Sequence, residues 1–327
     1  MPLLPLPPPS PFEPPSLLYL LLSSPLKLLT RHIHALILLL RGPPHRPART
    51  NRIRLVCLSD THTHTPPTVP AGDLLIHAGD LSNAGTIAQI QAQLDWLNSL
   101  PHSEKIVVAG NHDSHLDPSS REAIADPDAD AGKSLDWGEI HYLERRAITL
   151  AFPGHGNRRL RIYGAPQIPA CGDRSFAFQY ERDGEDAWSG TVPRGTDVLV
   201  THTPPRHHLD LPSGAGCRFL LGECWRVRPA VHVFGHVHAG YGRESVFWDE
   251  EQRVYERLCE RGDGGVVGDV FAVGAWIDIV RLLWYGVQGV LWSRVWGGDG
   301  GGSVMVNASL AYRNTGKLGN PVQVVDI

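Results

Sequence analysis

The sequence of 327 residues predicts an α/β fold. Short apolar runs recur from residue 53 onwards, and a polar cluster follows each run either directly or after one glycine, which is typical of buried strands. Residues 86–100, with apolar side chains at helical spacing, lie between the second run and the third, and this alternation is typical of α/β sheets. The five runs are IRLVCL (53–58), DLLIHA (73–78), KIVVA (105–109), DVLV (197–200) and VHVF (231–234).

The first 51 residues differ in composition from the rest of the chain. They are rich in proline and leucine, and Glu13 is their single acidic residue among several arginines. Prolines remove backbone donors and oppose a helix at the start of this segment. We therefore expect a Pro/Leu-rich basic leader at residues 1–51, either disordered or membrane-associating, and one domain at residues 52–327.

Two long apolar segments raise the question of a membrane. Charged residues and Pro25 interrupt residues 17–40, and Asp278 and Arg281 interrupt residues 266–296. A spanning helix needs about 20 mostly apolar residues, so we expect neither segment to cross a bilayer. Peripheral membrane contact through both segments is one interpretation. Packing or a partner contact is the favoured interpretation, with the second segment forming a hydrophobic insertion at about 262–302.

Charge and cysteine content exclude several classes. The formal net charge is −4, so no basic field indicates nucleic acid, and we expect none as a partner. Five cysteines without a C-x-x-C pattern argue against a disulfide framework or a four-thiolate zinc site. We expect a cytoplasmic protein, with membrane association as an addition and a mitochondrial leader as the alternative. The oligomeric state is not readable.

The polar residues that follow the five runs carry the chemistry. The carboxyl ends of strands in α/β proteins meet at one edge, so we expect these side chains to converge. Carboxylates, imidazoles and one amide without a thiolate suit zinc, iron or manganese. Asp60 and His62 are two residues apart, as are His236 and His238, which on an extended chain puts each pair on one side. The full set is Asp60, His62, Asp80, Asn111, His112, Asp113, His202, His236 and His238.

The number of candidate ligands indicates two ions. Seven remain when His112 and Asp113 are set aside, which is too many for one four-coordinate ion but fits two that share a residue. Two cations about 3.5–4 Å apart clamp an in-line displacement at phosphorus. Asp80 is the natural bridge, because a carboxylate offers two oxygens and a negative charge. His112 is placed to protonate the leaving oxygen.

These motifs resemble the calcineurin-like metallophosphoesterases. The matching blocks are D-x-H (60–62), GD (79–80), GNHD (110–113), TH (201–202) and GHVH (235–238). The resemblance covers roughly residues 53–247 and the last strand. RIYGAP (161–166), THTPP (201–205) and residues 227–242 are similar to the MPPED subfamily, as is the ending around 307–308 and 320–321. That subfamily is similar to the class III cyclic-nucleotide phosphodiesterases.

The resemblance implies a four-layer α-β-β-α sandwich with a dinuclear site. It assigns one metal to Asp60, His62 and His238, the other to Asn111, His202 and His236, with Asp80 as the bridge. It makes His112 the general acid or a stabiliser of the transition state. Some members have glycine in place of His236, so this chain is expected to load both metals, of which Mn, Fe and Zn are the candidates.

Two departures from the Ser/Thr protein phosphatases bear on the substrate. The second block continues as GDLSNAG (79–85), and Ser114 follows GNHD. The arginines that would bind the phosphate of a phosphoprotein are therefore absent from these motifs. Asn83 also stands where an aspartate often pairs with the catalytic histidine, which leaves the partner of His112 open, with Asp113 as one candidate.

We therefore expect hydrolysis of phosphoester bonds by a hydroxide that bridges two metals, with His112 as general acid. Phosphodiesters or other small phosphorylated molecules are the expected substrates, and a cyclic nucleotide is one candidate. The alternative is a catalytically weak metal-binding scaffold or regulatory protein of the same fold.

Overall fold

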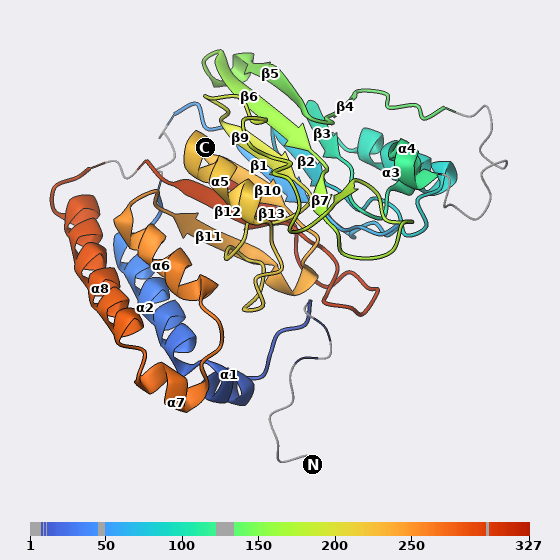
Figure 1. The fold of residues 1–327 in the computed structure, drawn as a ribbon. Helices are drawn as coiled ribbons and strands as arrows, with labels where there is room; N and C mark the ends of the chain where they lie inside the picture. Colours follow the sequence, from blue (N-terminus) through green and yellow to red (C-terminus); the bar gives the residue numbers. More distant parts are fainter. Residues whose placement is uncertain (1–7, 9, 11, 45–49, 122–133, 299–300) are drawn as a thin grey trace.

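The computed structural model describes residues 8, 10, 12–44, 50–121, 134–298 and 301–327 (Figure 1). Two sheets lie at its centre. The first has the strand order β13-β1-β2-β3-β4 and the second β11-β12-β10-β9-β6-β5, while β7 and β8 form a separate pair. The strands are β1 (Arg54–Leu58), β2 (Leu74–Ala78), β3 (Glu104–Val108), β4 (Ile140–Tyr142), β5 (Arg146–Phe152), β6 (Arg158–Ala165), β7 (Ile168–Pro169), β8 (Gln179–Tyr180), β9 (Val198–Thr201), β10 (Val231–Phe234), β11 (Gly242–Val246), β12 (Ser303–Asn307) and β13 (Gln323–Asp326).

The helices lie outside the two sheets. They are α1 (Leu17–Ser23), α2 (Pro25–Arg41), α3 (Ile87–Ser99), α4 (Pro118–Arg121), α5 (Arg218–Val227), α6 (Glu250–Glu260), α7 (Gly265–Val270) and α8 (Val273–Arg294), with 3₁₀ turns at Ser114–Leu116, Pro153–His155 and His238–Gly240. The five predicted strands are confirmed, and the predicted helix at residues 86–100 is α3. Of the predicted leader, residues 1–7, 9, 11 and 45–49 lie outside the described residues.

The side-chain alternation of the strands builds the four layers. Leu55 and Cys57 of β1 lie in the core between the two sheets, whereas Val56 and Leu58 face α3. This is the period of two that a strand buried on both faces requires. On the far side of the second sheet, α5 packs its Leu220 into a further core. The expected α-β-β-α sandwich is therefore confirmed.

Strand direction determines where the polar loops lie. β1, β2 and β3 run parallel to one another in the first sheet, and β9 and β10 run parallel in the second. Their carboxyl ends carry the five polar motifs. Both sheets therefore contribute to the candidate site, which lies where the ends of these strands meet.

A separate group of helices covers one end of the molecule, and we call α1, α2, α6, α7 and α8 the helical annex (Figure 1). α2 and α8 each pack against α6 around their own apolar cluster, which includes Ile37, Leu258 and Ile279. α2 comes from the predicted leader and α8 from the predicted insertion, so these distant segments fold together. The disordered alternative for the leader therefore does not hold for α2. No helix among the described residues is both long and apolar enough to span a bilayer.

Buried ionisable groups join the annex to the second sheet. His208, in the loop after β9, lies 3.4 Å (Nδ1–Oε1) from Glu244 of β11 and 3.3 Å (Nε2–Oε1) from Glu256 of α6. His34 of α2 lies 2.9 Å (Nδ1–Oε1) from Glu251 and 3.8 Å (Nε2–Oε1) from Glu244. Glu244 therefore sits between two histidines that belong to different parts of the fold.

Burial by itself lowers the pKa of His208, but the carboxylates of Glu244 and Glu256 raise it to about 10. Burial alone raises the pKa of Glu244, but the charge of His208 lowers it to about 2. Because its pKa is raised, the charged form of His208 adds to the free energy of unfolding. This contribution is complete below the ordinary pKa of 6.5 and is lost as the pH rises towards 10. The Glu244 contribution is present above its ordinary value of 4.5 and is lost as the pH falls towards 2.

We expect His208→Gln to lower the melting temperature most at pH 5–6.5, with the deficit narrowing as the pH approaches 10. Over that interval the wild type loses the positive charge of His208, whereas the glutamine variant has no such charge to lose. Thermal unfolding at a series of pH values measures this, with His141→Gln, a partly exposed histidine of β4 beside Glu104, as the matched control. A deficit that stays constant with pH would show that His208 acts through packing alone.

Candidate metal centre

Four of the predicted ligands lie together at the ends of the central strands. Ligand atoms of Asp60, His62, Asp80 and His238 all fall within 4.8 Å of one another. Nε2 of His238 is 3.2 Å from Oδ1 of Asp60 and 3.3 Å from Nε2 of His62. The two imidazole nitrogens face each other, and the carboxylate lies close to one of them. At these distances the three donors could bind one divalent cation together.

The three remaining predicted ligands gather beside this group. Nε2 of His202 lies 3.0 Å from Oδ1 of Asn111, and the rings of His202 and His236 are 5.2 Å apart. Nε2 of His236 is buried and has no hydrogen-bond partner within the described structure. A buried ring nitrogen without a partner is costly unless it has a ligand to bind, so this atom fits a metal site.

Asp80 lies between the two groups. Its Oδ2 is 3.7 Å from Nε2 of His62 and 3.4 Å from Nε2 of His202. Its Oδ1 accepts a hydrogen bond of 2.8 Å from the backbone N–H of His112. One oxygen therefore reaches both groups of imidazoles while the other fixes the carboxylate to the GNHD loop.

The local backbone differs from the extended chain that the spacing of two suggested. Asp60, His62, Asp80 and His236 have φ values of 54°, 46°, 57° and 66°, in the left-handed region that residues with a Cβ rarely adopt. The side chains converge because the chain turns sharply after each strand, so the extended-chain reasoning for these pairs was wrong. Unfavourable backbone conformations at several residues of one cluster are typical of functional sites.

Two glycines of the motifs allow these turns to pack closely. A Cβ atom on Gly110 would collide with the Asp80 carboxylate, and one on Gly235 would collide with Asp60 and Ser59. Each glycine is thus needed because a carboxylate of the candidate site lies directly against the backbone. This gives a physical reason for glycine in the GNHD and GHVH motifs.

The buried carboxylate of Asp80 has an imidazole as its countercharge. Burial raises the pKa of Asp80, but the charge of His202 holds it well below its ordinary value. Burial lowers the pKa of His202, but the Asp80 carboxylate raises it to about 9. A cation bound here would replace the His202 proton as the countercharge of Asp80, and binding would therefore release protons.

Backbone carbonyls orient several of the rings. Nδ1 of His202 donates to the Ala78 carbonyl at 2.8 Å, and Nδ1 of His238 donates to the Arg313 carbonyl at 2.8 Å. Each bond fixes the tautomer that leaves Nε2 facing the site. The sequence gives no signal for these partners, because every residue carries a carbonyl.

His112 is oriented in the same way. Its Nδ1 donates to the Asn83 carbonyl at 3.0 Å, so the partner is the backbone of the residue that replaces aspartate. The carboxylate of Asp113, the candidate partner, instead accepts hydrogen bonds from the backbone N–H groups of Gly110 and Ser82, at 2.8 and 2.9 Å. Asp113 therefore ties two ligand-bearing loops together, and its proposed role beside His112 is wrong.

Aromatic rings that the sequence analysis did not identify stand beside these histidines. The Phe176 ring is 4.9 Å from the His112 ring, and the Phe12 ring is 5.2 Å from the His236 ring in an edge-on contact. Phe12 belongs to the proline-rich segment before α1, and Glu13 beside it accepts a hydrogen bond of 2.8 Å from Asn314. No local pattern connects this segment with motifs that follow it at such a distance.

A four-layer sandwich with carboxylate and imidazole donors at the carboxyl ends of its strands fits a metal-dependent phosphoesterase. The chain belongs to the calcineurin-like phosphoesterase family, whose model matches residues 53–240. The family predicted from the motifs is therefore confirmed, and it supports metal-dependent hydrolysis of phosphoesters as the general class of activity.

Several known proteins are similar to the chain. It is 36% identical over 215 residues to metallophosphoesterase domain-containing protein 1 of Homo sapiens, covering 61% of this chain and 65% of that protein. A UPF0046 protein of Caenorhabditis elegans is 36% identical over 203 residues, covering 59% of this chain and 66% of its own. A probable rhamnogalacturonate lyase C of Emericella nidulans is 39% identical over 261 residues, covering 79% of this chain but 23% of its own. The chain thus spans under a quarter of the last protein and under two thirds of the human one.

We expect His62→Ala to lower the amount of divalent metal that the purified protein retains. The substitution removes a nitrogen donor from the four-residue cluster, and His64→Ala, two residues away at an exposed position, is the matched control. Metal content after dialysis, measured by plasma mass spectrometry, distinguishes the two. Equal metal content in both variants would remove His62 from the ligand set.

Proposed function

We propose that the protein is a two-metal phosphoesterase that hydrolyses small phosphodiesters. The observation that carries this proposal is the position of Asp80, whose Oδ2 lies within 3.7 Å of Nε2 of both His62 and His202. A shared carboxylate between two donor groups is what a pair of cations requires. Asp60, His62 and His238 would hold one cation, Asn111, His202 and His236 would hold the other, and Asp80 would contact both.

Divalent cations at such a site supply Lewis acidity, which activates water and neutralises charge on the phosphoryl oxygens. The donors accommodate Mn, Fe or Zn, since all three accept imidazole and carboxylate ligands.

His112 has the geometry of a proton donor. Its Nδ1–H is engaged by the Asn83 carbonyl, which leaves Nε2–H of the protonated ring for a leaving oxygen. Its ring centroid lies 4.9 Å from that of His62, so the imidazole is next to the ligand cluster without belonging to it. A positioned proton donor typically contributes a factor of about 10²–10⁴ in rate.

The surroundings of His112 favour a small organic ester over a phosphoprotein. Ser114 follows GNHD, where the protein phosphatases have an arginine, and its hydroxyl donates to the Ser175 carbonyl at 2.6 Å. The Phe176 ring beside His112 and the Phe12 ring beside His236 offer apolar faces on which a planar group would stack. A cyclic nucleotide combines a diester with such a planar base and is the specific substrate that we propose.

We expect Asp80→Ala to abolish both the hydrolysis of bis(p-nitrophenyl) phosphate and the retention of metal. His112→Ala should keep the metal and lower kcat for a cyclic nucleotide, whose alkoxide leaving group needs a proton, by about 10²–10⁴, because only proton donation is lost. The assay compares the wild type, both variants and His64→Ala as control, each loaded in turn with Mn²⁺, Fe²⁺ and Zn²⁺. Unchanged kcat in His112→Ala would contradict its role as general acid.

A comparison of substrates tests the diester preference. The ratio of kcat/KM for a cyclic nucleotide to that for the corresponding nucleoside monophosphate should exceed one. Phe176→Ala should raise KM for both esters, because both carry the planar base that would stack on its ring, and should leave the ratio unchanged. A preference for the monoester would retain the site and change the substrate class. Metal retained by the wild type without turnover of either ester would favour the scaffold alternative.

A further inference from the structure

The outer face of α8 is apolar along almost its whole length. Its exposed side chains follow helical spacing and include Trp276, Ile277, Val280, Leu283, Trp284 and Val287. The opposite face, with Ile279 and Leu282, packs into the annex. A surface helix ordinarily places charged or polar residues on its outer face. Exposure of this apolar face to water is therefore unfavourable.

The neighbouring helices of the annex also carry exposed apolar side chains. Leu17 and Leu21 of α1, and Val267 and Phe271 at α7, are all exposed, with Phe271 at 76%. α1 contacts α2 and α7, and α2 contacts α8, so these residues belong to one connected group of helices at one end of the molecule (Figure 1). The catalytic ligands lie on other elements and take no part in this surface.

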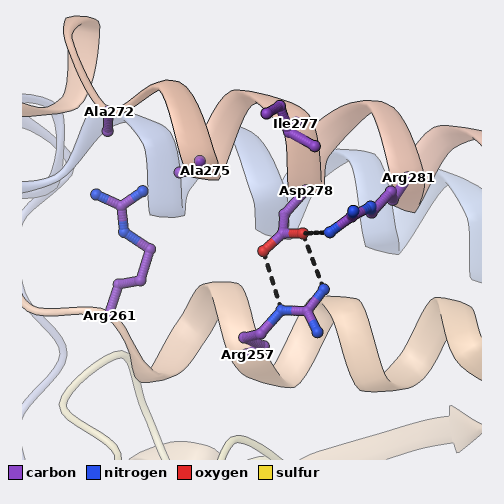
Figure 2. A pocket seen from close by; sticks show the side chains of 8 residues that line it. Arg257, Arg261, Ala272, Ala275, Ile277, Asp278 and Arg281 are labelled. Carbon is purple, nitrogen blue, oxygen red and sulfur yellow. Dashed lines mark hydrogen bonds and ion pairs between the residues drawn. The ribbon is translucent and has the colours of Figure 1, made fainter.

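A basic groove borders the same surface. It has a volume of about 550 Å³, lies between α6 and α8, and is lined by Arg257, Arg261 and Arg281 (Figure 2). Ile277 also lines it and is 48% exposed, so the groove and the outer face of α8 share an edge.

The groove carries more positive than negative charge. Asp278 accepts two hydrogen bonds from Arg257, at 2.8 and 2.9 Å, and one of 3.0 Å from Arg281 (Figure 2). Arg261 lies farther along the groove, with its Nη2 3.9 Å from Oδ1 of the buried Asp269. Three guanidinium groups thus line the groove, while Asp278 pairs with two of them and Asp269 lies near the third, which leaves one net positive charge. The side chains of Arg257 and Arg281 are each more than half exposed.

We propose that the outer face of α8 docks the protein onto an anionic phospholipid bilayer, with a lipid headgroup phosphate in the groove of Arg257, Arg261 and Arg281. The apolar face enters the acyl boundary while the arginines remain at the headgroup level. Tryptophans on the outer face suit this depth, because their rings are amphipathic. The charged residues Asp278 and Arg281 within α8 agree with a helix that lies in the plane of the interface.

Charge complementarity favours the bilayer over a second copy of the chain. A twofold partner would present the same surface, so the net positive charge of its groove would face the net positive charge of the first copy. Specific protein interfaces also carry about one hydrogen bond per 100–200 Å², whereas most exposed side chains of α8 are Val, Ile, Leu and Trp. An anionic lipid surface satisfies both the apolar face and the excess positive charge.

Vesicle flotation of the full chain tests the proposal. The wild type should bind vesicles of phosphatidylcholine with 30% phosphatidylglycerol more strongly than pure phosphatidylcholine, and Trp284→Glu should reduce that binding at least tenfold. The matched control is Thr149→Glu, which adds the same charge on the exposed edge strand β5 at the opposite border of the second sheet. Equal melting temperatures of the variants keep the comparison meaningful.

A second pair of variants tests the groove. Arg261→Gln with Arg281→Gln should weaken binding to the anionic vesicles by about fivefold for each arginine, since each basic residue near an anionic surface contributes a factor of this order. Arg146→Gln on β5 removes a positive charge elsewhere and should have no such effect.

Three results would overturn the proposal. Absence of vesicle binding by the wild type would exclude the bilayer. Equal binding to neutral and anionic vesicles would remove the groove from the interaction. A dimer in light scattering that Trp284→Glu dissociates, without vesicle binding, would assign the surface to a second copy. Each outcome is independent of hydrolysis, so it does not depend on the proposed catalytic function.

Discussion

The buried carboxylate of Asp80 is the constraint on which the site depends. It lies between two groups of imidazoles, with one oxygen towards His62 and His202 and the other held by the backbone of His112. A charge taken out of water needs compensating partners, and the partners here come from both sheets. The two-sheet sandwich is therefore what brings the countercharges together, since neither sheet alone carries the full set.

The same constraint explains the unusual backbone around the site. The ligands must approach one another closely at the ends of strands, so four of them adopt left-handed conformations. Gly110 and Gly235 leave room for the carboxylates of Asp80 and Asp60 where any side chain would collide. The strain and the glycines thus serve one purpose, the close packing of charged groups.

Sequence patterns predicted the five strands that carry the motifs, α3 and the ligand candidates because each leaves a local signal, either apolar residues at a regular spacing or a polar cluster after an apolar run. The partners of His112, His202 and His238 were not predictable, since they are backbone carbonyls. The pairing of α2 with α8 was also missed. These helices are far apart in the chain, and Ile37 packs against Gly286 through contacts that neither segment encodes by itself.

The annex and the site are joined through the second sheet. Glu244 of β11 contacts His34 of the annex and His208, while the carbonyl of the adjacent Leu209 accepts a hydrogen bond from Asn307. Asn307 also donates to the Val237 carbonyl, between two candidate ligands. The helices that we propose to meet a membrane are therefore in continuous contact with the loop that carries His236 and His238.

The number of metal ions per chain tests the central claim most directly. Titration with Mn²⁺, followed by calorimetry and metal analysis, should give two ions per chain for the wild type. His236→Ala should retain one, because Asp60, His62, Asp80 and His238 would still form the first cluster. A single ion in the wild type, or two in the variant, would contradict a site in which Asp80 serves both groups of ligands.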